Sequence, residues 1–173
     1  MKIKVTLIAL MAVANLFALN VGEKPKEVVI EKENGGLVKD GSPWNSNMLK
    51  EKVYVMFYVD PDEKDLNEDF SQALKAKEYR KKGDFGSLAV INLAATWKPN
   101  FIIESILKGK QKEFPKTIYV KDKNKVLVNE WDIADDNSDI IIFDKSGKVI
   151  FYKAGKMNDE DMQQAFQLIE ENI

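Results

Sequence analysis

The sequence predicts an α/β fold, a central mixed β-sheet flanked by helices with a β extension on its N-terminal side. Three patterns support this prediction: an uncharged strand-like run over 53–59, two later stretches with helical spacing of apolar residues, and a hairpin signal over 144–147. The chain has 173 residues, 45% of them hydrophobic and 31% charged. This composition is typical of one ordinary folded domain rather than of a disordered or fibrous chain.

Two successive strand–helix units make up the middle of the chain. Residues 53–59 are apolar, β-branched or aromatic, as a strand covered on both faces requires, so we expect this strand at the centre of the sheet. Helical spacing follows over 66–74, and a second buried strand is predicted over 88–93. We expect Pro99 in the first turn of a second helix. The inner stripe of that helix is predicted to be Ile102, Ile103, Ile106 and Leu107.

The last third of the chain changes pattern. A short strand is predicted over 117–120 and a strong one over 139–143, followed by a return strand over 149–152 after the turn Asp144-Lys145-Ser146-Gly147. Asn158 is expected to cap a closing helix. Two strand–helix units imply parallel strands with right-handed crossovers. With the hairpin and closing helix added, this order is the thioredoxin-like plan.

The N-terminal extension precedes the central strand. Residues 27–30 and 35–38 predict short strands around a turn. A second turn over 42–46 is expected to cap a short helix that runs through Leu49.

The first eighteen residues have the pattern of a secretory signal peptide. Lys2 and Lys4 precede an apolar run over 5–17, which is shorter than the ~20 residues that a permanent membrane helix needs. We expect cleavage after Ala18, with cleavage after Ala14 as the alternative. A retained anchor is the other interpretation of the same segment.

The expected product is therefore a single domain over residues 19–173 that lies outside the cytoplasm. No cysteine follows the apolar run, so lipid attachment through a cysteine is excluded. With 26 basic and 28 acidic residues, the chain carries a formal charge of −2, and we expect no nucleic-acid partner.

The absence of both histidine and cysteine excludes most familiar catalysis. Ser-His-Asp and Cys-His nucleophile pairs, zinc sites of the usual ligands and disulfides all need one of these residues. We therefore predict no catalytic residue and no cofactor.

Several short motifs resemble a known family. They are Trp44-Asn45-Ser46, Leu49, Lys52-Val53, Trp131, Ser138, Ile140-Ile141-Ile142 and the stretch from Asp144 to Val149. In order and spacing they are similar to the YtfJ family of exported bacterial proteins, over nearly the whole chain from about Val21. The resemblance implies a periplasmic thioredoxin-like domain.

The fold prediction locates what is missing. Redox-active domains of this plan carry a Cys-x-x-Cys loop after the central strand, and that loop here is Asp60 to Asp65. Ser138 stands where such domains place a cis-proline. Thiol–disulfide exchange and peroxide reduction need a thiolate, so this chain cannot perform either by itself.

Acidic residues occupy the place of the reactive loop and of a neighbouring loop. Clustered carboxylates are suitable ligands for Ca²⁺ or Mg²⁺. The metal candidates are Asp60, Asp62, Asp135 and Asp136. Acids near helix starts also stabilise the helix dipole without any metal, which is the structural interpretation of the same residues. A hydrolase that uses paired carboxylates is a further alternative.

Surface recognition is the hypothesis that we favour, with another envelope protein or a peptide as the partner. A lysine-rich stretch over 108–125 is typical of a solvated face or of a surface for anionic lipid or an acidic partner. Among Trp44, Trp97 and Trp131, we expect Trp97 to be the best candidate for a partner anchor, because it lies in the loop before the second helix. A lid over the hydrophobic core is the other interpretation of a side chain this large. An interaction module of this kind predicts an exposed apolar patch near the edge of the former active site.

Overall fold

The computed structural model describes residues 18–173, apart from the side chains of Arg80 and Lys82. The signal peptide expected over residues 1–18 lies outside the described residues, except for Ala18. The strands are β1 (Val29–Ile30), β2 (Gly35–Leu37), β3 (Trp44–Asn45), β4 (Val53–Val59), β5 (Phe85–Asn92), β6 (Thr117–Asp122), β7 (Ser138–Phe143) and β8 (Val149–Lys153). The helices are α1 (Glu68–Ala76), α2 (Asn100–Glu113), α3 (Val126–Trp131) and α4 (Asp159–Asn172).

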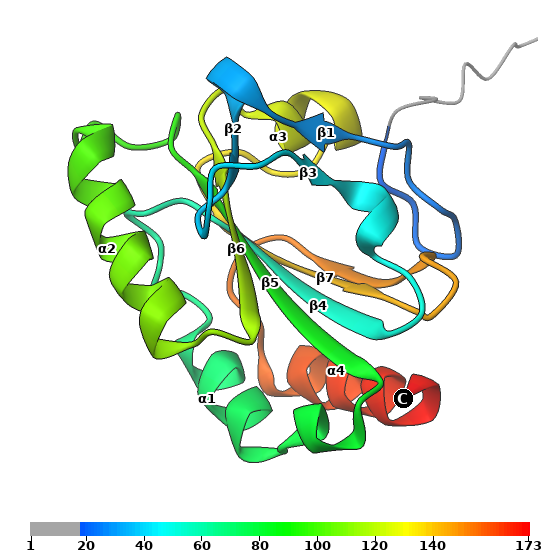
Figure 1. Ribbon diagram of the computed structural model, residues 1–173. Coiled ribbons are helices and arrows are strands. Elements are labelled where there is room, and N and C mark those ends of the chain that lie inside the picture. The colour runs from blue at the N-terminus through cyan, green and yellow to red at the C-terminus, as the bar shows by residue number, and fades with distance from the viewer. Residues whose placement is uncertain (1–17) are drawn as a thin grey trace, which may run out of the picture.

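A six-stranded mixed sheet in the order β2-β6-β5-β4-β7-β8 forms the centre of the molecule (Figure 1). Strands β4, β5 and β6 are parallel, whereas β7, β8 and β2 run antiparallel to their neighbours. The uncharged strand β4 lies inside the sheet between β5 and β7, as its composition predicts. The predicted thioredoxin-like plan, including the N-terminal β extension, is confirmed.

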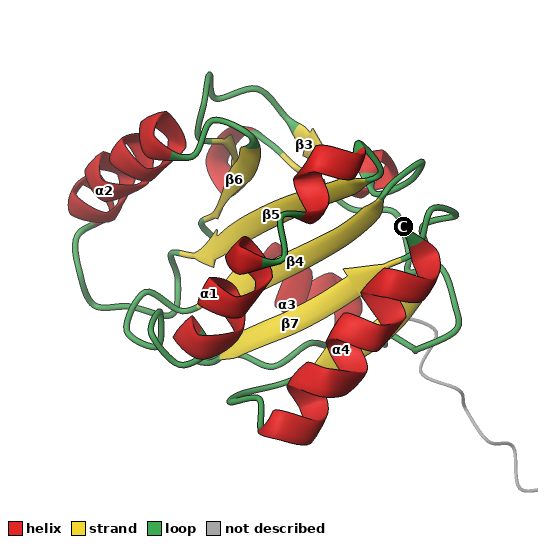
Figure 2. Ribbon diagram, turned by 90° about the horizontal axis from the view of Figure 1, so that it is seen from below, coloured by secondary structure: helices red, strands yellow, loops and turns green. Residues whose placement is uncertain are grey.

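The two faces of the sheet are covered by different elements (Figure 2). On one face, Val53 and Val55 of β4 pack with the buried residues of α1 and α4. Farther along the same face, Val59 packs with the buried residues of α2. On the opposite face, Met56 and Tyr58 of β4 pack with α3 and with the N-terminal extension. Because successive side chains of a strand point to opposite faces, β4 contributes to the hydrophobic core on both sides of the sheet.

The hairpin and the closing helix follow the sequence signals. The carboxylate of Asp144 accepts hydrogen bonds from the amides of Ser146 (2.8 Å) and Lys148 (2.9 Å), and Gly147 adopts a φ of 85°. At the start of α4, Asn158 and Asp161 form a reciprocal capping box. Local hydrogen bonding thus fixes both features, and both predictions are confirmed.

The N-terminal extension differs from the prediction in its pairing. Strands β1 and β2 do not pair around a turn, because β1 pairs with β3 and β2 pairs with β6, both antiparallel. Glycine is required where β2 crosses β6, since a Cβ on Gly35 would lie 2.0 Å from the carbonyl oxygen of Lys121.

Helix α3 was not predicted, because its cap comes from outside the local sequence pattern. The Asp122 carboxylate, at the end of β6, accepts hydrogen bonds from the amides of Val126 (2.8 Å) and Leu127 (3.0 Å). This capping group lies four residues before the helix, whereas the usual signal stands immediately before it.

The predicted inner stripe of α2 is half wrong. Ile103 and Leu107 are buried, but Ile102 and Ile106 are 43% and 55% exposed. Successive helical residues are separated by about 100°. The sheet beneath α2 therefore covers the row that contains Ile103 and Leu107 and leaves the row that contains Ile102 and Ile106 in solvent. Pro99 also stands just before the helix, at its N-cap, rather than inside its first turn.

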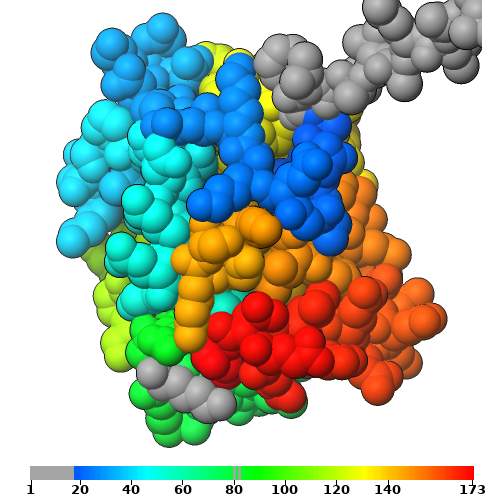
Figure 3. Space-filling view, turned by 90° about the vertical axis from the view of Figure 1, so that its right-hand side faces the viewer, coloured from blue at the N-terminus to red at the C-terminus, as the bar shows by residue number. Residues whose placement is uncertain are grey.

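The segment that follows the predicted signal peptide is part of the fold. The Leu19 side chain is buried, and its amide donates to the carbonyl oxygen of Trp131 (2.7 Å). Gly22 and Glu23 then exchange backbone hydrogen bonds with Val149 of β8. Figure 3 shows this N-terminal segment, in blue, lying against the β7–β8 hairpin, in orange.

Candidate functional site

The loop that follows β4 occupies the place of the reactive loop in redox-active relatives of this fold. Asp60 is buried at 4% exposure, and its carboxylate accepts from the amide of Asp62 (2.8 Å). The Asp60 amide donates to the carbonyl oxygen of Asn137 (2.8 Å). Burial, followed by the negative charges of Asp136 and Glu63, raises the pKa of Asp60. Asp60 therefore braces the loop.

Asp62 connects the loop after β4 with the loop after β5. Its carboxylate accepts from the Thr96 hydroxyl (2.8 Å) and forms an ion pair with Lys98. Thr96 and Lys98 flank Trp97, so this pair of contacts holds the tryptophan's backbone on both sides.

Asp135 connects β5 with the segment after α3. Its carboxylate accepts from the side-chain amide of Asn92 (2.9 Å) and pairs with Lys125. Burial opposes ionisation of Asp135, but the hydrogen bonds from Lys125, the Asp136 amide and Asn92 outweigh it and lower its pKa.

The four predicted metal candidates come together at one end of the sheet. The charges of Asp135 and Asp136 both act on Asp60, which places the two loops side by side as expected. Each of Asp62 and Asp135, however, meets a lysine. Across residues 18–173, no group of three His, Cys, Asp or Glu side chains is arranged to hold a metal ion. Metal binding stays a prediction, and calorimetry with Ca²⁺, Mg²⁺ and Mn²⁺ tests it.

Two further carboxylates lie buried beneath this edge. Asp122, which was missed as a site residue, caps α3 and also accepts from the Tyr58 hydroxyl (3.2 Å). Burial raises the pKa of Asp122 despite these hydrogen bonds. Asp139 is 0% exposed and accepts from the Ala134 amide (3.1 Å) and the Tyr152 hydroxyl (3.2 Å).

Burial raises the pKa of Asp139 to about 6. A perturbed carboxyl can indicate catalysis when it faces a cleft. Asp139 and Asp122 are both 0% exposed, and their hydrogen bonds stabilise the segments at either end of α3. Their geometry serves the fold and offers a substrate no access to either carboxyl.

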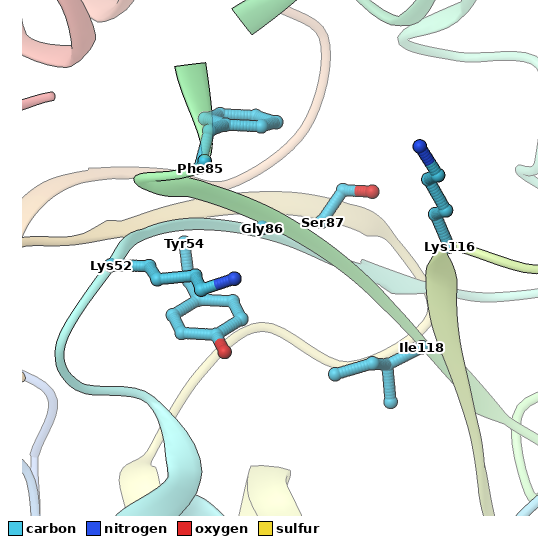
Figure 4. Close-up of a pocket in the computed structure, with 8 residues that line it drawn as sticks. Lys52, Tyr54, Phe85, Gly86, Ser87, Lys116 and Ile118 are labelled. Carbon is cyan, nitrogen blue, oxygen red and sulfur yellow. The ribbon is translucent and has the colours of Figure 1, made fainter. Parts of the chain in front are cut away.

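A hollow of about 380 Å³ lies at the opposite end of the parallel strands. Figure 4 shows Lys52 and Tyr54 on one side of the β5 ribbon and Ser87 and Lys116 on the other. The polar groups of a binding pocket converge on a common point. These two lysine side chains lie on opposite sides of β5 and do not converge in this way (Figure 4).

An apolar surface begins beside the Asp62 loop and continues along α2. Trp97 is 85% exposed and Phe101 74%, and the outward-facing Ile102 and Ile106 extend the same surface. We call these four residues the α2 patch. Trp44 and Trp131, by contrast, are buried. The predicted exposed apolar patch near the former active-site edge is present, and it contains the predicted tryptophan.

The lysines of the predicted lysine-rich stretch fall into three groups with different surroundings. Lys121 and Lys123 both pair with Glu104 of α2, and Lys125 pairs with Asp135. The remaining lysines stand on or near the second half of α2, beyond the α2 patch. They are Lys108, Lys110, Lys112 and Lys116.

The fold and the residues at this edge define the class: a thioredoxin-like domain whose loop after β4 carries aspartates and no cysteine. Within residues 18–173, none of the helices has the length and apolarity to cross a membrane.

The chain belongs to the family described as "Bacterial protein of unknown function (YtfJ_HI0045)", whose model matches residues 14–172. It is 31% identical to an uncharacterized protein of Haemophilus influenzae over 146 residues, which cover 79% of this chain and 78% of that protein. It is 25% identical to the uncharacterized protein YtfJ of Escherichia coli over 172 residues, 95% of this chain and 91% of that protein. The family predicted from the sequence motifs is confirmed.

Among solved structures, the chain is similar to the thioredoxin domain of a thiol-disulfide oxidoreductase from Bacteroides vulgatus. The TM-score is 0.58 at 17% sequence identity, and the match covers 87% of this chain and 98% of that one. At this level of identity the likeness shows the fold alone.

Proposed function

We propose that the protein is a non-catalytic binding module that holds another envelope protein or a peptide on the α2 patch. The observation that supports this proposal is the exposure of four large apolar side chains on α2 and on the loop before it, led by Trp97 and Phe101. Contiguous exposed apolar surface is costly in water and marks interaction sites. Tryptophan is also among the residues that contribute most to binding at interfaces.

The position of the patch also favours recognition. It begins at the carboxyl ends of the parallel strands, where α/β sheets commonly bind ligands. Two contacts of Asp62 brace the loop that carries Trp97, so the aromatic side chain is presented from an ordered loop. A braced anchor loses less conformational entropy on binding than a flexible one.

Export to the periplasm is part of the proposal. It is supported by the N-terminal sequence pattern and by the contacts of Leu19, the residue after the predicted cleavage position. Leu19 is buried against the core and its amide is hydrogen-bonded to Trp131, so cleavage after Ala18 would leave every described contact from Leu19 onward intact. Mass determination of the protein recovered from the periplasm should give a chain that starts at Leu19. A chain that starts elsewhere, or recovery in the membrane with residues 1–18 retained, would reject this cleavage position.

Chemical crosslinking in intact cells tests the binding role. We expect the wild-type protein to capture a discrete partner, and the double substitution Trp97→Ala, Phe101→Ser to reduce capture at least about tenfold, because hot-spot residues carry most of the binding energy. The matched control is Val29→Ser with Met48→Ser, which removes exposed apolar side chains elsewhere. Equal capture by the wild type and the Trp97 and Phe101 variant would refute the α2 patch as the binding surface.

A further inference from the structure

We infer that the α2 patch receives an amphipathic helix whose acidic side chains lie toward the C-terminal half of α2. This inference rests on the proposed function and adds the chemistry of the partner segment. Its basis is the order of side chains along the exposed side of α2.

Two neighbouring stripes run the length of this helix. Residues separated by three or four positions share a helix face. One stripe consists of Phe101, Ser105, Lys108 and Lys112, and the other of Ile102, Ile106, Gly109 and Glu113. All eight residues are exposed. Two adjacent stripes at this spacing form the ridge-and-groove surface against which another helix packs.

Small residues leave a shallow depression in the middle of this surface. Ser105 and Gly109 are small, and a Cβ placed on Gly109 would meet no heavy atom within 4 Å. A partner helix can approach closely above these positions, since helix axes pack about 8–10 Å apart depending on the side chains between them. Phe101 and Ile102 stand at one end of this region and Ile106 stands beside it, and all three can pack against the apolar side of the partner.

The exposed surface of α2 also changes from apolar to basic along the helix. The apolar residues occupy the first two turns, and Lys108 and Lys112 follow in the third and fourth. Lys110 forms an ion pair with Glu113 (3.3 Å). Within the described part of the chain, Lys108 and Lys112 form no ion pair. Beside the hydrogen bond from Lys123, which is the largest cause, the charge of Lys108 does contribute to the lowered pKa of Glu104. Two exposed positive charges on one stripe, in a protein whose formal charge is −2, favour an acidic group opposite them.

The same order of side chains favours a helix over a lipid surface. A helix that lies in a membrane interface is apolar along its whole length and carries lysines on its flanks. On α2 the apolar and basic residues follow one another along the axis, and Glu113 lies on the exposed surface with them. A short partner helix with apolar residues at one end and acidic residues at the other matches this order.

Selection from a displayed library of helical peptides tests the inference. Peptides of about 14 residues span about four helical turns. We expect the purified protein to enrich peptides with apolar residues three and four positions apart followed by Asp or Glu. The charge-reversed variant Lys108→Glu, Lys112→Glu should weaken the binding of these peptides by at least about tenfold. It should enrich lysine-bearing peptides in their place.

Three controls make the outcomes distinct. Lys24→Glu with Lys148→Glu makes the same change of net charge away from α2 and should leave the selected peptides bound. Gly109→Leu should block close approach and reduce binding, whereas Gly109→Ala adds only a Cβ that meets no heavy atom within 4 Å and should reduce binding less. All the substituted side chains on α2 are exposed, so thermal unfolding should stay close to that of the wild type.

Other results would overturn the inference in identifiable ways. Enrichment of extended peptides, or of helical peptides whose binding ignores the two lysines, would refute the acidic helix while leaving the α2 patch as the binding surface. Absence of enrichment would refute it as well, and crosslinking of the Trp97 and Phe101 variant then tests the proposed function separately. Binding to vesicles of anionic phospholipid that is lost on Lys108→Glu, Lys112→Glu, without peptide binding, would replace the helix with a lipid surface.

Discussion

Helices α2 and α4 are both 14 residues long, yet they use their apolar side chains in opposite ways. On α4, Met162, Phe166 and Leu168 pack around the buried Ala165 and Ile169, and no large apolar side chain of the helix is left exposed. On α2, Ile103 and Leu107 are buried in the core, while Phe101, Ile102 and Ile106 face solvent. The difference teaches that the exposed side chains of α2 are not needed for folding, which leaves them available for recognition.

The largest effect should come from equivalent truncations on the two helices. Ile169→Ala on α4 should lower the free energy of unfolding by about 2–5 kcal/mol, because it leaves a cavity in a fully buried position. Ile106→Ala on α2 should change it by less than about 0.5 kcal/mol. Urea denaturation followed by circular dichroism measures both. Similar losses for the two variants would mean that the exposed face of α2 carries stability after all.

A second prediction compares how a buried and an exposed aspartate change the stability with pH. With a pKa of about 6 in the folded state, Asp139 binds its proton more tightly than in the unfolded chain, where an aspartate titrates near 3.9. Its contribution to stability is therefore fully present below about pH 4 and is lost as the pH rises through about 6. The loss amounts to about 3 kcal/mol.

Asp139→Asn removes this titration and keeps a hydrogen-bond acceptor for Tyr152 and Ala134. Relative to the wild type, the variant should therefore gain about 3 kcal/mol in unfolding free energy between pH 4 and pH 7. The control is Asp69→Asn, which removes an exposed carboxyl away from Asp139 and should keep the wild-type pH profile. Parallel pH profiles for the wild type and Asp139→Asn would show that the buried carboxyl does not titrate in this range.

The helix starts differ as well, and the effect should be smaller. Asn158 caps α4 through the Asp161 amide (2.8 Å), whereas Pro99 at the start of α2 offers no side-chain hydrogen bond. Asn158→Ala should cost about 1 kcal/mol, and Pro99→Ser should stabilise the protein by about 0.5 kcal/mol or leave it unchanged. Thermal unfolding measures the pair, and a destabilised Pro99→Ser would show that the proline fixes the entry to α2.

The smallest effect on stability should follow from the loss of the Asp62 brace. Asp62→Ala removes an exposed ion pair and the Thr96 hydrogen bond, which together contribute about 1 kcal/mol or less. The local effect should be larger, with faster amide hydrogen exchange at Lys98, whose amide donates to the Thr96 hydroxyl oxygen (3.2 Å). Lys64→Ala, which removes another surface ion pair, is the control. Unchanged exchange at Lys98 would mean that Asp62 does not order the loop.

Much of the fold was predictable because its signals are local. The uncharged run of β4, the Asp144 turn and the Asn158 cap each lie within a few residues of the element that they specify. Helix α3 was missed because its cap, Asp122, belongs to the preceding strand. The pairing of β1 with β3 was missed for a similar reason, since strand partners are chosen by distant packing.

The candidate site was predictable in part. Trp97 was selected among the three tryptophans for its place in the loop before a helix, and the structure leaves it exposed rather than lying as a lid over the core. Ile102 and Ile106 were assigned to the wrong face, because helical spacing gives the angle between residues but not the direction of the core. The acids were located correctly, but the lysines that neutralise Asp62 and Asp135 are distant in sequence or lie on another element.

The backbone bonds that join Gly22 and Glu23 to Val149 have one further consequence. Strand β8 is the last in the sheet, and an uncovered outermost strand is a template for pairing with other chains. Gly22 and Glu23 occupy part of that template themselves. A shortened protein that begins after Glu23 would lose this protection and would be expected to self-associate through the β8 margin as its concentration rises.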